Sequence, residues 1–257
     1  MTKTTTRTST VANENLSFPK ARLVEPAASG YIHLAAEVDK RPPFLPNSRK
    51  KRRLIAGLKK QARRLEADPG VLSAVVFDAL LIPPGRGEFV EKRPGKVHVA
   101  RFDLSVLIET ESPEAADALR ASPAYRGMED AVREAASFVH AVAATNARRM
   151  GPIGSVDHGR QGIFLFNHFF ADDTARNLAV WEDTAGWWGR ATGLDNSTVL
   201  LPREGQPSDY NSINHYRWDS LGDVLPSMIF KRTFRTFVLA NFEANDVAAM
   251  PILYRLA

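Results

Sequence analysis

The order of apolar and polar positions in the second half of the chain predicts alternating strands and helices. Apolar residues recur with period two, or form short apolar runs bounded by turn residues, at 163–170, 197–202 and 210–218. Helices are predicted from the caps Asp172-Asp173-Thr174 and Asp219-Ser220. The closing run MPILYRLA reads as a strand that begins at a proline and is compatible with a sheet edge. The second half therefore follows the order β-α-β-β-α-β.

The first half shows a similar order of elements up to its fourth strand. Strands are predicted at 30–38, 71–82 and 97–110, with an amphipathic helix that stops near Asp68-Pro69-Gly70. Ser112-Pro113 begins a long helical region that extends to about Arg149, with an interruption near Ser122-Pro123. A fourth strand is expected only around 151–156. His140, in the run FVHAVAA, is accordingly placed on an apolar helix.

Two such units predict an α+β fold. We expect two tandem ferredoxin-like β-α-β-β-α-β units whose antiparallel sheets close a pseudo-dimeric α+β barrel. The helices of each unit cover one face of its sheet, so the two remaining apolar faces are expected to meet around a cavity. The predicted divisions are a flexible N-terminal tail (1–29), a first half (30–156) and a second half (157–257), joined by the glycine-rich segment 151–162.

Polar residues interrupt two neighbouring apolar strands of the second half. Asn167-His168 lies on its first strand and Asn214-His215 on its third. Because successive side chains point to opposite faces, one member of each pair should point into the cavity, but the alternation does not tell which one. A buried unpaired amide or imidazole costs about 1–3 kcal/mol, so these groups either bond to one another or to water, or meet a ligand.

The composition of the chain excludes several kinds of functional group and binding site. The chain of 257 residues is 44% hydrophobic and 25% charged and contains no cysteine. No disulfide, thiolate nucleophile or Cys-ligated metal is therefore expected. No metal-binding motif and no glycine-rich phosphate loop is present. The first fifteen residues lack the apolar centre of a secretory signal, and no run is long enough to span a membrane. We expect a cytoplasmic protein with no membrane partner.

The net charge of +5 comes from one segment, residues 49–64. Nine Lys and Arg residues lie there without an acid: Arg49, Lys50, Lys51, Arg52, Arg53, Lys59, Lys60, Arg63 and Arg64. Leucine and alanine recur at helical spacing through the same segment, so an amphipathic helix with a solvated basic face is favoured. Binding of nucleic acid or of an acidic partner remains open, but no base-stacking aromatic residue or DNA-binding motif lies nearby.

The stretch RFDLSVLIETESPEAADALRASPAYRGM resembles the dimeric α+β barrel superfamily. This superfamily includes antibiotic-biosynthesis monooxygenases, haem-degrading oxygenases and EthD-like proteins. Its members often carry an Asn on the first strand and a Trp at the end of the third. In this chain, Asn167 in LFNHFF and Trp218 in YRWDSLGDVLP occupy similar positions. A member with a single half must dimerise to close its barrel, whereas a tandem chain closes it internally, so a monomer or a homodimer is expected.

The resemblance implies a small-molecule enzyme with cofactor-independent, monooxygenase-like oxidoreductase chemistry on an apolar or aromatic compound. In that interpretation Asn167 and Asn214 bind a substrate oxygen, and His168 or His215 is the general base. The apolar walls would come from three aromatic residues on the same two strands: Phe166, Tyr216 and Trp218. Trp181, Trp187 and Trp188 are expected to be core residues.

Two alternatives remain from the sequence. A haem-binding barrel is one, although the helix after Trp218 contains no His where haem-degrading members carry their axial ligand. Haem would then need His140 or His215 in a different arrangement. A non-catalytic ligand-binding or interaction module is the other alternative.

Overall fold

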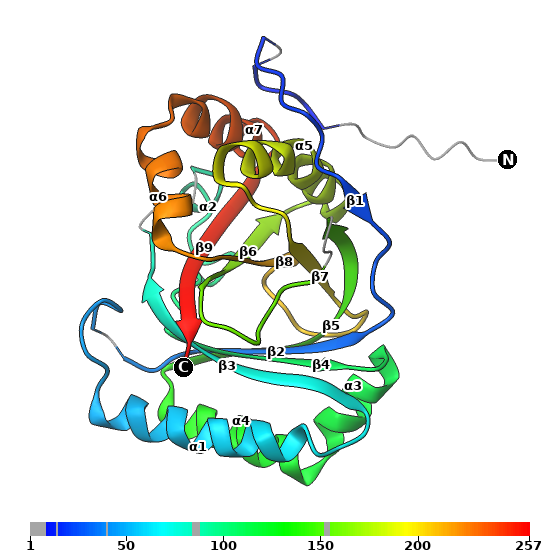
Figure 1. Ribbon diagram of the computed structural model, residues 1–257, viewed down its shortest axis with the longest axis vertical. Helices are drawn as coiled ribbons and strands as arrows, with labels where there is room; N and C mark the ends of the chain where they lie inside the picture. The colour runs from blue at the N-terminus through cyan, green and yellow to red at the C-terminus, as the bar shows by residue number, and fades with distance from the viewer. Residues whose placement is uncertain (1–8, 14, 40, 84–87, 152–154) are drawn as a thin grey trace, which may run out of the picture.

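Eight strands close into a barrel within the part of the chain that the computed structural model describes, residues 9–13, 15–39, 41–83, 88–151 and 155–257 (Figure 1). Around the barrel the strand order is β5-β2-β4-β3-β9-β6-β8-β7, and β7 pairs with β5 to complete the circle. All neighbouring strands are antiparallel. The predicted α+β fold of two tandem ferredoxin-like units is confirmed.

The first unit runs from β2 to β5. Its elements are β2 (Gly30–Glu37), α1 (Arg49–Leu65), β3 (Val71–Leu81), α2 (Glu88–Glu91), β4 (Leu104–Thr110), α3 (Pro113–Ala121), α4 (Pro123–Ala135) and β5 (Phe138–Met150). The helical region predicted to reach Arg149 is wrong beyond Ala135, and the fourth strand lies at 138–150 rather than 151–156. Residues 152–154 lie outside the described residues. The alanine-rich run was compatible with a helix, but pairing with β2 and β7 makes it a strand, because tertiary context overrides propensity.

The second unit repeats the order from β6 to β9. Its elements are β6 (Ile163–Ala171), α5 (Thr174–Thr192), β7 (Ser197–Pro202), β8 (Ser212–Trp218), α6 (Leu221–Phe230), the π-helix η1 (Phe234–Leu239), α7 (Ala240–Ala244) and β9 (Val247–Leu256). Gly193 ends α5 in the left-handed conformation, with φ of 70°, which glycine adopts at little cost. The predicted boundary at 156/157 falls between β5 and β6.

The strand β9 is not an edge strand, which corrects the interpretation of MPILYRLA. It pairs with β6 along its whole length and with β3 near its C-terminal end, from Phe77↔Leu256 to Leu81↔Leu253. Together with the pairing of β5 and β7, this contact closes the two sheets into one barrel. The chain therefore closes its barrel internally.

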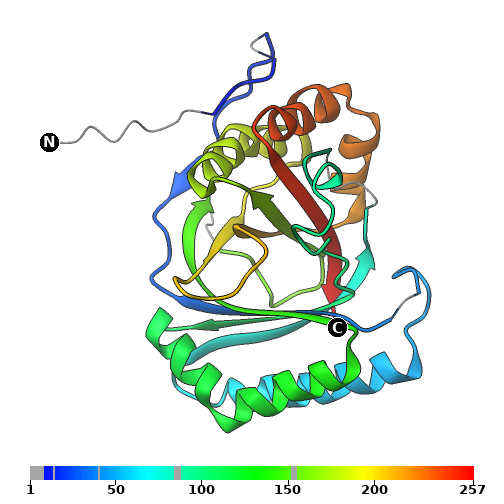
Figure 2. The same ribbon diagram turned by 180° about the vertical axis from the view of Figure 1, so that it is seen from behind.

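Three layers of side chains fill the molecule. Helices α1, α3 and α4 cover the outer face of the first sheet, and α5, α6, η1 and α7 cover that of the second (Figures 1 and 2). Between the sheets, the barrel interior contains buried aromatic residues such as Phe77, Phe102 and Phe166. The two apolar faces thus meet as expected, and the histidines join the aromatic rings between them.

The N-terminal segment contacts both halves. The strand β1 (Leu23–Val24) pairs with β5. Phe18 packs against Phe237 with ring centroids 4.6 Å apart and the ring planes tilted by 53°. The backbone N–H groups of Thr10 and Ala12 donate to the side chains of Asn245 and Asn241. Within the tail predicted for 1–29, the described segments 9–13 and 15–29 therefore contact the rest of the chain, while residues 1–8 and 14 lie outside the described residues.

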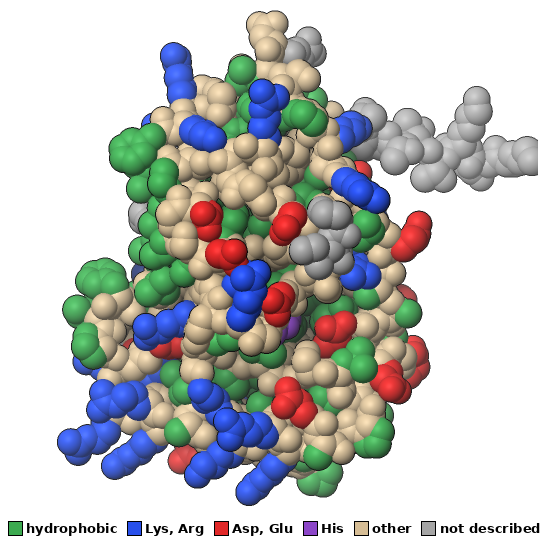
Figure 3. Space-filling view, in the orientation of Figure 1, with side chains coloured by type: hydrophobic (Ala, Val, Ile, Leu, Met, Phe, Trp, Pro, Cys, Tyr) green, Lys and Arg blue, Asp and Glu red, His purple; other side chains and the backbone are tan. Residues whose placement is uncertain are grey.

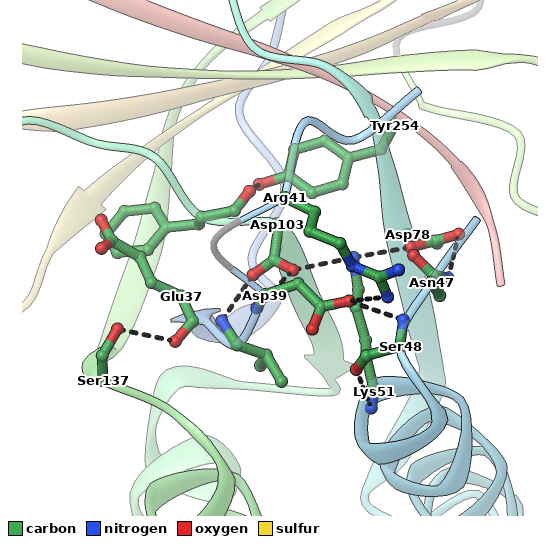
Figure 4. A network of polar contacts seen from close by, with 12 residues as sticks. Glu37, Asp39, Arg41, Asn47, Ser48, Lys51, Asp78, Asp103, Ser137 and Tyr254 are labelled. Carbon is green, nitrogen blue, oxygen red and sulfur yellow. Dashed lines mark hydrogen bonds and ion pairs between the residues drawn. The ribbon is translucent and has the colours of Figure 1, made fainter. Parts of the chain in front are cut away.

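The helix α1 is amphipathic as predicted, with one exception on its basic face. Lys and Arg side chains gather along the lower edge of the molecule, over the helices of the first unit (Figure 3). Lys51, however, is only 1% exposed and forms ion pairs with Asp78 and Asp103 (Figure 4). Lys51, which the sequence pattern placed among the solvated charges, is therefore a buried cation with a structural role.

Candidate functional site

A cavity of about 430 Å³ lies between the outer face of the second sheet and the helices that cover it. The strands contribute Leu165, Asn167, Tyr216, Val247, Ala249 and Pro251; the helices contribute Trp188, Met228, Phe234, Val238, Leu239, Phe242 and Glu243; and Pro83 and Phe89 come from the first unit. We call this the helix-side pocket. Its walls are apolar almost throughout, as in sites that bind small organic molecules.

The π-helix η1 forms one wall of this pocket through Phe234, Val238 and Leu239. A π-helical turn has one more residue per hydrogen-bonded ring than an α-helical turn, and such turns are frequent at functional sites. Pro226 lies inside α6 just before it and cannot donate a backbone hydrogen bond. The irregular path from α6 to α7 borders the void.

Asn167 is the buried polar residue of the pocket wall. It is 7% exposed, and its Oδ1 atom accepts no hydrogen bond from the described residues. Its cross-strand partner Asn214 differs, because Asn214 Oδ1 accepts from Ser197 Oγ at 2.5 Å. Of the two predicted amides, therefore, one faces the pocket with an unused acceptor and the other is satisfied by the protein.

The aromatic residues proposed as walls have different positions. Tyr216 lines the pocket, and burial raises the pKa of its hydroxyl group well above the usual value, so the hydroxyl stays protonated. Trp218 is not part of the pocket lining but packs against Tyr216, with ring centroids 4.8 Å apart. Its Nε1 donates to Thr192 Oγ1 at 3.0 Å. Phe166 contacts the barrel interior instead. Trp188, expected to be a core residue, lines the pocket.

His215 faces the barrel interior, on the opposite side of the sheet from Asn214. Its ring stacks on Phe166 at a centroid distance of 4.0 Å. Its Nδ1 lies 3.1 Å from the carbonyl oxygen of Leu165 and its Nε2 lies 2.8 Å from His158 Nε2. Since a carbonyl only accepts, Nδ1 of His215 donates and its Nε2 accepts from His158. Burial lowers the pKa of His215 well below 6.5.

His168 also faces the barrel interior and lies near two further imidazoles. Its ring centroid is 5.4 Å from that of His33 and 6.5 Å from that of His140, and neither of its ring nitrogens has a side-chain partner among the described residues. Burial lowers the pKa of His168 from 6.5 to about 3 and that of His140 to about 4. His140 lies on β5, not on a helix, and its Nε2 is 3.0 Å from Ser208 Oγ.

The predicted catalytic residues therefore separate into two groups. Asn167 and Asn214 point toward the helices, whereas His168 and His215 point into the barrel. A single ligand in the helix-side pocket meets no imidazole from β6 or β8. The carboxylate at its rim, Glu243, and the aromatic wall of η1 were missed by the sequence reasoning. The only sequence signal for this wall was an apolar stripe at helical spacing, which is equally typical of a packed core. The stripe consists of Phe230, Phe234, Phe237, Val238 and Phe242.

The pocket does not offer the usual protein ligand of haem. No His occurs among the described residues that line it, so an axial imidazole is lacking there. The described His, Asp and Glu residues also form no group of three or more that could hold a metal ion. Among the described helices, none is long and apolar enough to cross a membrane.

Comparison with solved structures finds this architecture in other proteins. An anthrone oxidase-like protein matches with a TM-score of 0.64 and 13% identity, over 92% of this chain and 94% of that one. A candidate monooxygenase from Fusobacterium nucleatum subsp. nucleatum matches with a TM-score of 0.51 and 9% identity, over 90% and 94%. No protein-family model and no curated protein matches the sequence. At such identities the likeness establishes the fold, and activity must be argued from the site.

Proposed function

We propose that this chain is a small-molecule enzyme with cofactor-independent, monooxygenase-like chemistry, because it has the fold of the dimeric α+β barrel superfamily, closed within one polypeptide. Its substrate is an apolar or aromatic compound that binds in the helix-side pocket. The names of the two structural neighbours, an anthrone oxidase-like protein and a candidate monooxygenase, support this class of chemistry. The size and apolar walls of the pocket support an aromatic substrate.

The unused acceptor of Asn167 is the observation that carries the proposal. A buried oxygen without a donor costs about 1–3 kcal/mol, and an apolar side chain of similar shape would avoid that cost. The asymmetry with Asn214, which is satisfied by Ser197, supports a ligand role for Asn167 alone. A substrate hydroxyl or N–H group that donates to Asn167 Oδ1 would remove the cost and orient the ring system between Trp188 and Tyr216.

In this proposal the apolar walls exclude water from the reacting carbon. Glu243 supplies the carboxylate that removes a proton from the bound substrate, a role for which His168 and His215 lie on the wrong side of the sheet. Dioxygen then oxidises the resulting carbanion. For a methylene carbon the balance is R₂CH₂ + O₂ → R₂C=O + H₂O, in which one oxygen atom enters the product and the other leaves as water.

Replacing Asn167 with leucine is expected to stabilise the protein and weaken binding. The free energy of unfolding should rise by about 1–2 kcal/mol, because the unpaired oxygen disappears. The affinity for 2-naphthol, measured by titration calorimetry, should fall about ten-fold, or about 1.4 kcal/mol. The matched control is Asn214→Leu, which removes a satisfied amide and should destabilise the fold. Equal destabilisation by both variants would contradict the role given to Asn167.

Filling the pocket should abolish binding without unfolding the protein. Ala249 is a pocket-wall residue on β9, and Ala249→Phe projects a ring into a void that is large enough to accept it. We expect no heat of 2-naphthol binding and a melting temperature within a few degrees of the parent value, on the order of the effect of 1 kcal/mol. Ala244→Phe, at an exposed position on α7 outside the pocket, is the control. Unchanged binding by Ala249→Phe would place the ligand elsewhere.

A non-catalytic ligand-binding module is the second candidate, and the position of the imidazoles favours it over a haem protein. The pocket contains one carboxylate and no imidazole, so a ligand could be held without being deprotonated. Consumption of dioxygen by the protein with a series of bound hydroxyarenes and anthrones separates the two candidates. Monomeric or homodimeric assembly and a cytoplasmic location remain expectations.

A further inference from the structure

A second cavity adjoins the helix-side pocket at the seam between the two units. It has a volume of about 520 Å³ and lies at the mouth of the barrel; Pro83 and Pro251 line both cavities. Its other lining residues include Glu37, Asp39, Arg41, Phe44 and Arg101. We call it the seam chamber. Two cavities that share two wall residues lie next to each other, on either side of β9.

The strand pairing explains why the two cavities adjoin there. The pairing between β3 and β9 ends at Leu81↔Leu253, next to a register shift, while β9 continues to Val247 on its other side against β6. The chain leaves β3 at Pro83, so the first part of β9 has no β3 neighbour. Pro251 lies in this part, where the missing N–H of proline is tolerated because no strand pairs on that side.

The seam chamber differs from the helix-side pocket in its chemistry. Two carboxylates, Glu37 and Asp39, and two guanidinium groups, Arg41 and Arg101, line it, so the formal charges of its described lining residues balance. Asp39 pairs with Arg41 at 3.5 Å, and Glu37 pairs with His98 at 2.7 Å. Arg101 forms no ion pair or hydrogen bond with the residues that the structure describes, and its donors are therefore available. A balanced set of acceptors and donors favours neither an anion nor a cation, but it suits hydroxyl groups, which both donate and accept. The ring of Phe44, 69% exposed, adds an apolar surface beside them.

We propose that the seam chamber binds a neutral, hydroxyl-rich substituent of the molecule whose aromatic part occupies the helix-side pocket. This inference rests on the proposed function and defines its substrate class as an aromatic aglycone with a sugar-like group. The apolar ring system is held by Trp188 and Tyr216, and the polar group turns around β9 at Pro251 toward Arg101. Because the charges that line the seam chamber balance, it selects against aromatic compounds that carry a charged group in the same place.

The test compares 2-naphthol with 6-hydroxy-2-naphthyl β-D-glucoside, which keeps a free naphthol hydroxyl for Asn167, by titration calorimetry. The glucoside should bind the parent protein about ten-fold more tightly, the effect of one or two added hydrogen bonds. Arg101→Ala should remove this preference and leave the affinity for 2-naphthol unchanged. Arg126→Ala, which removes an exposed arginine from α4, should change neither value. Ala249→Phe should prevent binding of both probes.

The outcomes separate the two proposals. If 2-naphthol binds but the glucoside binds no more tightly, or if Arg101→Ala keeps the preference, the seam chamber is not part of the site and the helix-side pocket stands. If neither probe binds the parent protein, the proposed pocket and its extension both fail.

Discussion

Replacing Lys51 with methionine is expected to lower the free energy of unfolding by about 3–5 kcal/mol, the typical cost of removing one partner from a buried ion pair. Lys51 Nζ lies 2.9 Å from Asp78 Oδ1 and 2.9 Å from Asp103 Oδ2. All three side chains are nearly inaccessible to water (Figure 4). Without the ammonium group, two carboxylates remain close together in a region of low polarity. Urea unfolding at neutral pH measures the loss.

The remaining partners of the network explain why it matters to the whole barrel. Burial alone would raise the pKa of Asp78, but hydrogen bonds from Lys51 and Arg255 hold this pKa below its usual value, so the group stays ionised. Arg255 is on β9, in the second unit, and Asp78 is on β3, in the first. Asp103 accepts from the backbone N–H groups of Val38 and Asp39 at 2.6 and 3.0 Å. The network therefore joins the two units and positions the loop after β2.

Lys50→Met provides the matched control, since Lys50 is the exposed neighbour of Lys51 on the same helix. Its effect should stay within about 0.5 kcal/mol, as for most surface substitutions. A loss below about 1 kcal/mol for Lys51→Met would mean that the carboxylates find other partners or water after the substitution.

Acidification from pH 6.5 to about 4.5 is expected to lower the stability by several kcal/mol, because buried imidazoles in the barrel are neutral in the folded state. Burial lowers the pKa of His140 to about 4 and that of His168 to about 3, whereas both return to 6.5 on unfolding. Above pH 6.5 both states carry neutral imidazoles and nothing is lost. Below it the unfolded chain binds protons that the folded chain excludes, so stability falls until the folded pKa is reached.

The slope identifies the residues responsible. Each such imidazole contributes about 1.4 kcal/mol per pH unit within this window. His33 and His215, whose pKa values burial also lowers well below 6.5, add to the slope. His168→Phe removes one group, so urea midpoints recorded between pH 6.5 and about 4.5 should fall less steeply for this variant. An equal slope for both proteins, or a flat profile for the parent, would show that the interior imidazoles are protonated in the folded state.

Much of the second unit could be predicted from local patterns. The caps Asp173 and Ser220 and the stop at Gly193 mark the ends of helices because their effects are local to the backbone. The run that became β5 could not be predicted in this way. Its alanine-rich composition permits either state, and the decision comes from β2 and β7, which are distant in sequence. The same holds for β9, whose position between the units depends on where the sheets join.

The sequence by itself determined that Asn167 and His168, and likewise Asn214 and His215, point to opposite sides of the second sheet, because side chains along a strand alternate. Only the tertiary structure decided which side is hollow. The centre of the barrel, which we expected to hold the cavity, is filled by large aromatic rings and imidazoles from both units, and on this side only the mouth of the barrel is hollow. The helix side retains a void, which the π-helical path from α6 to α7 borders. Cavities arise where packing is incomplete between elements distant in sequence, and no local pattern records that.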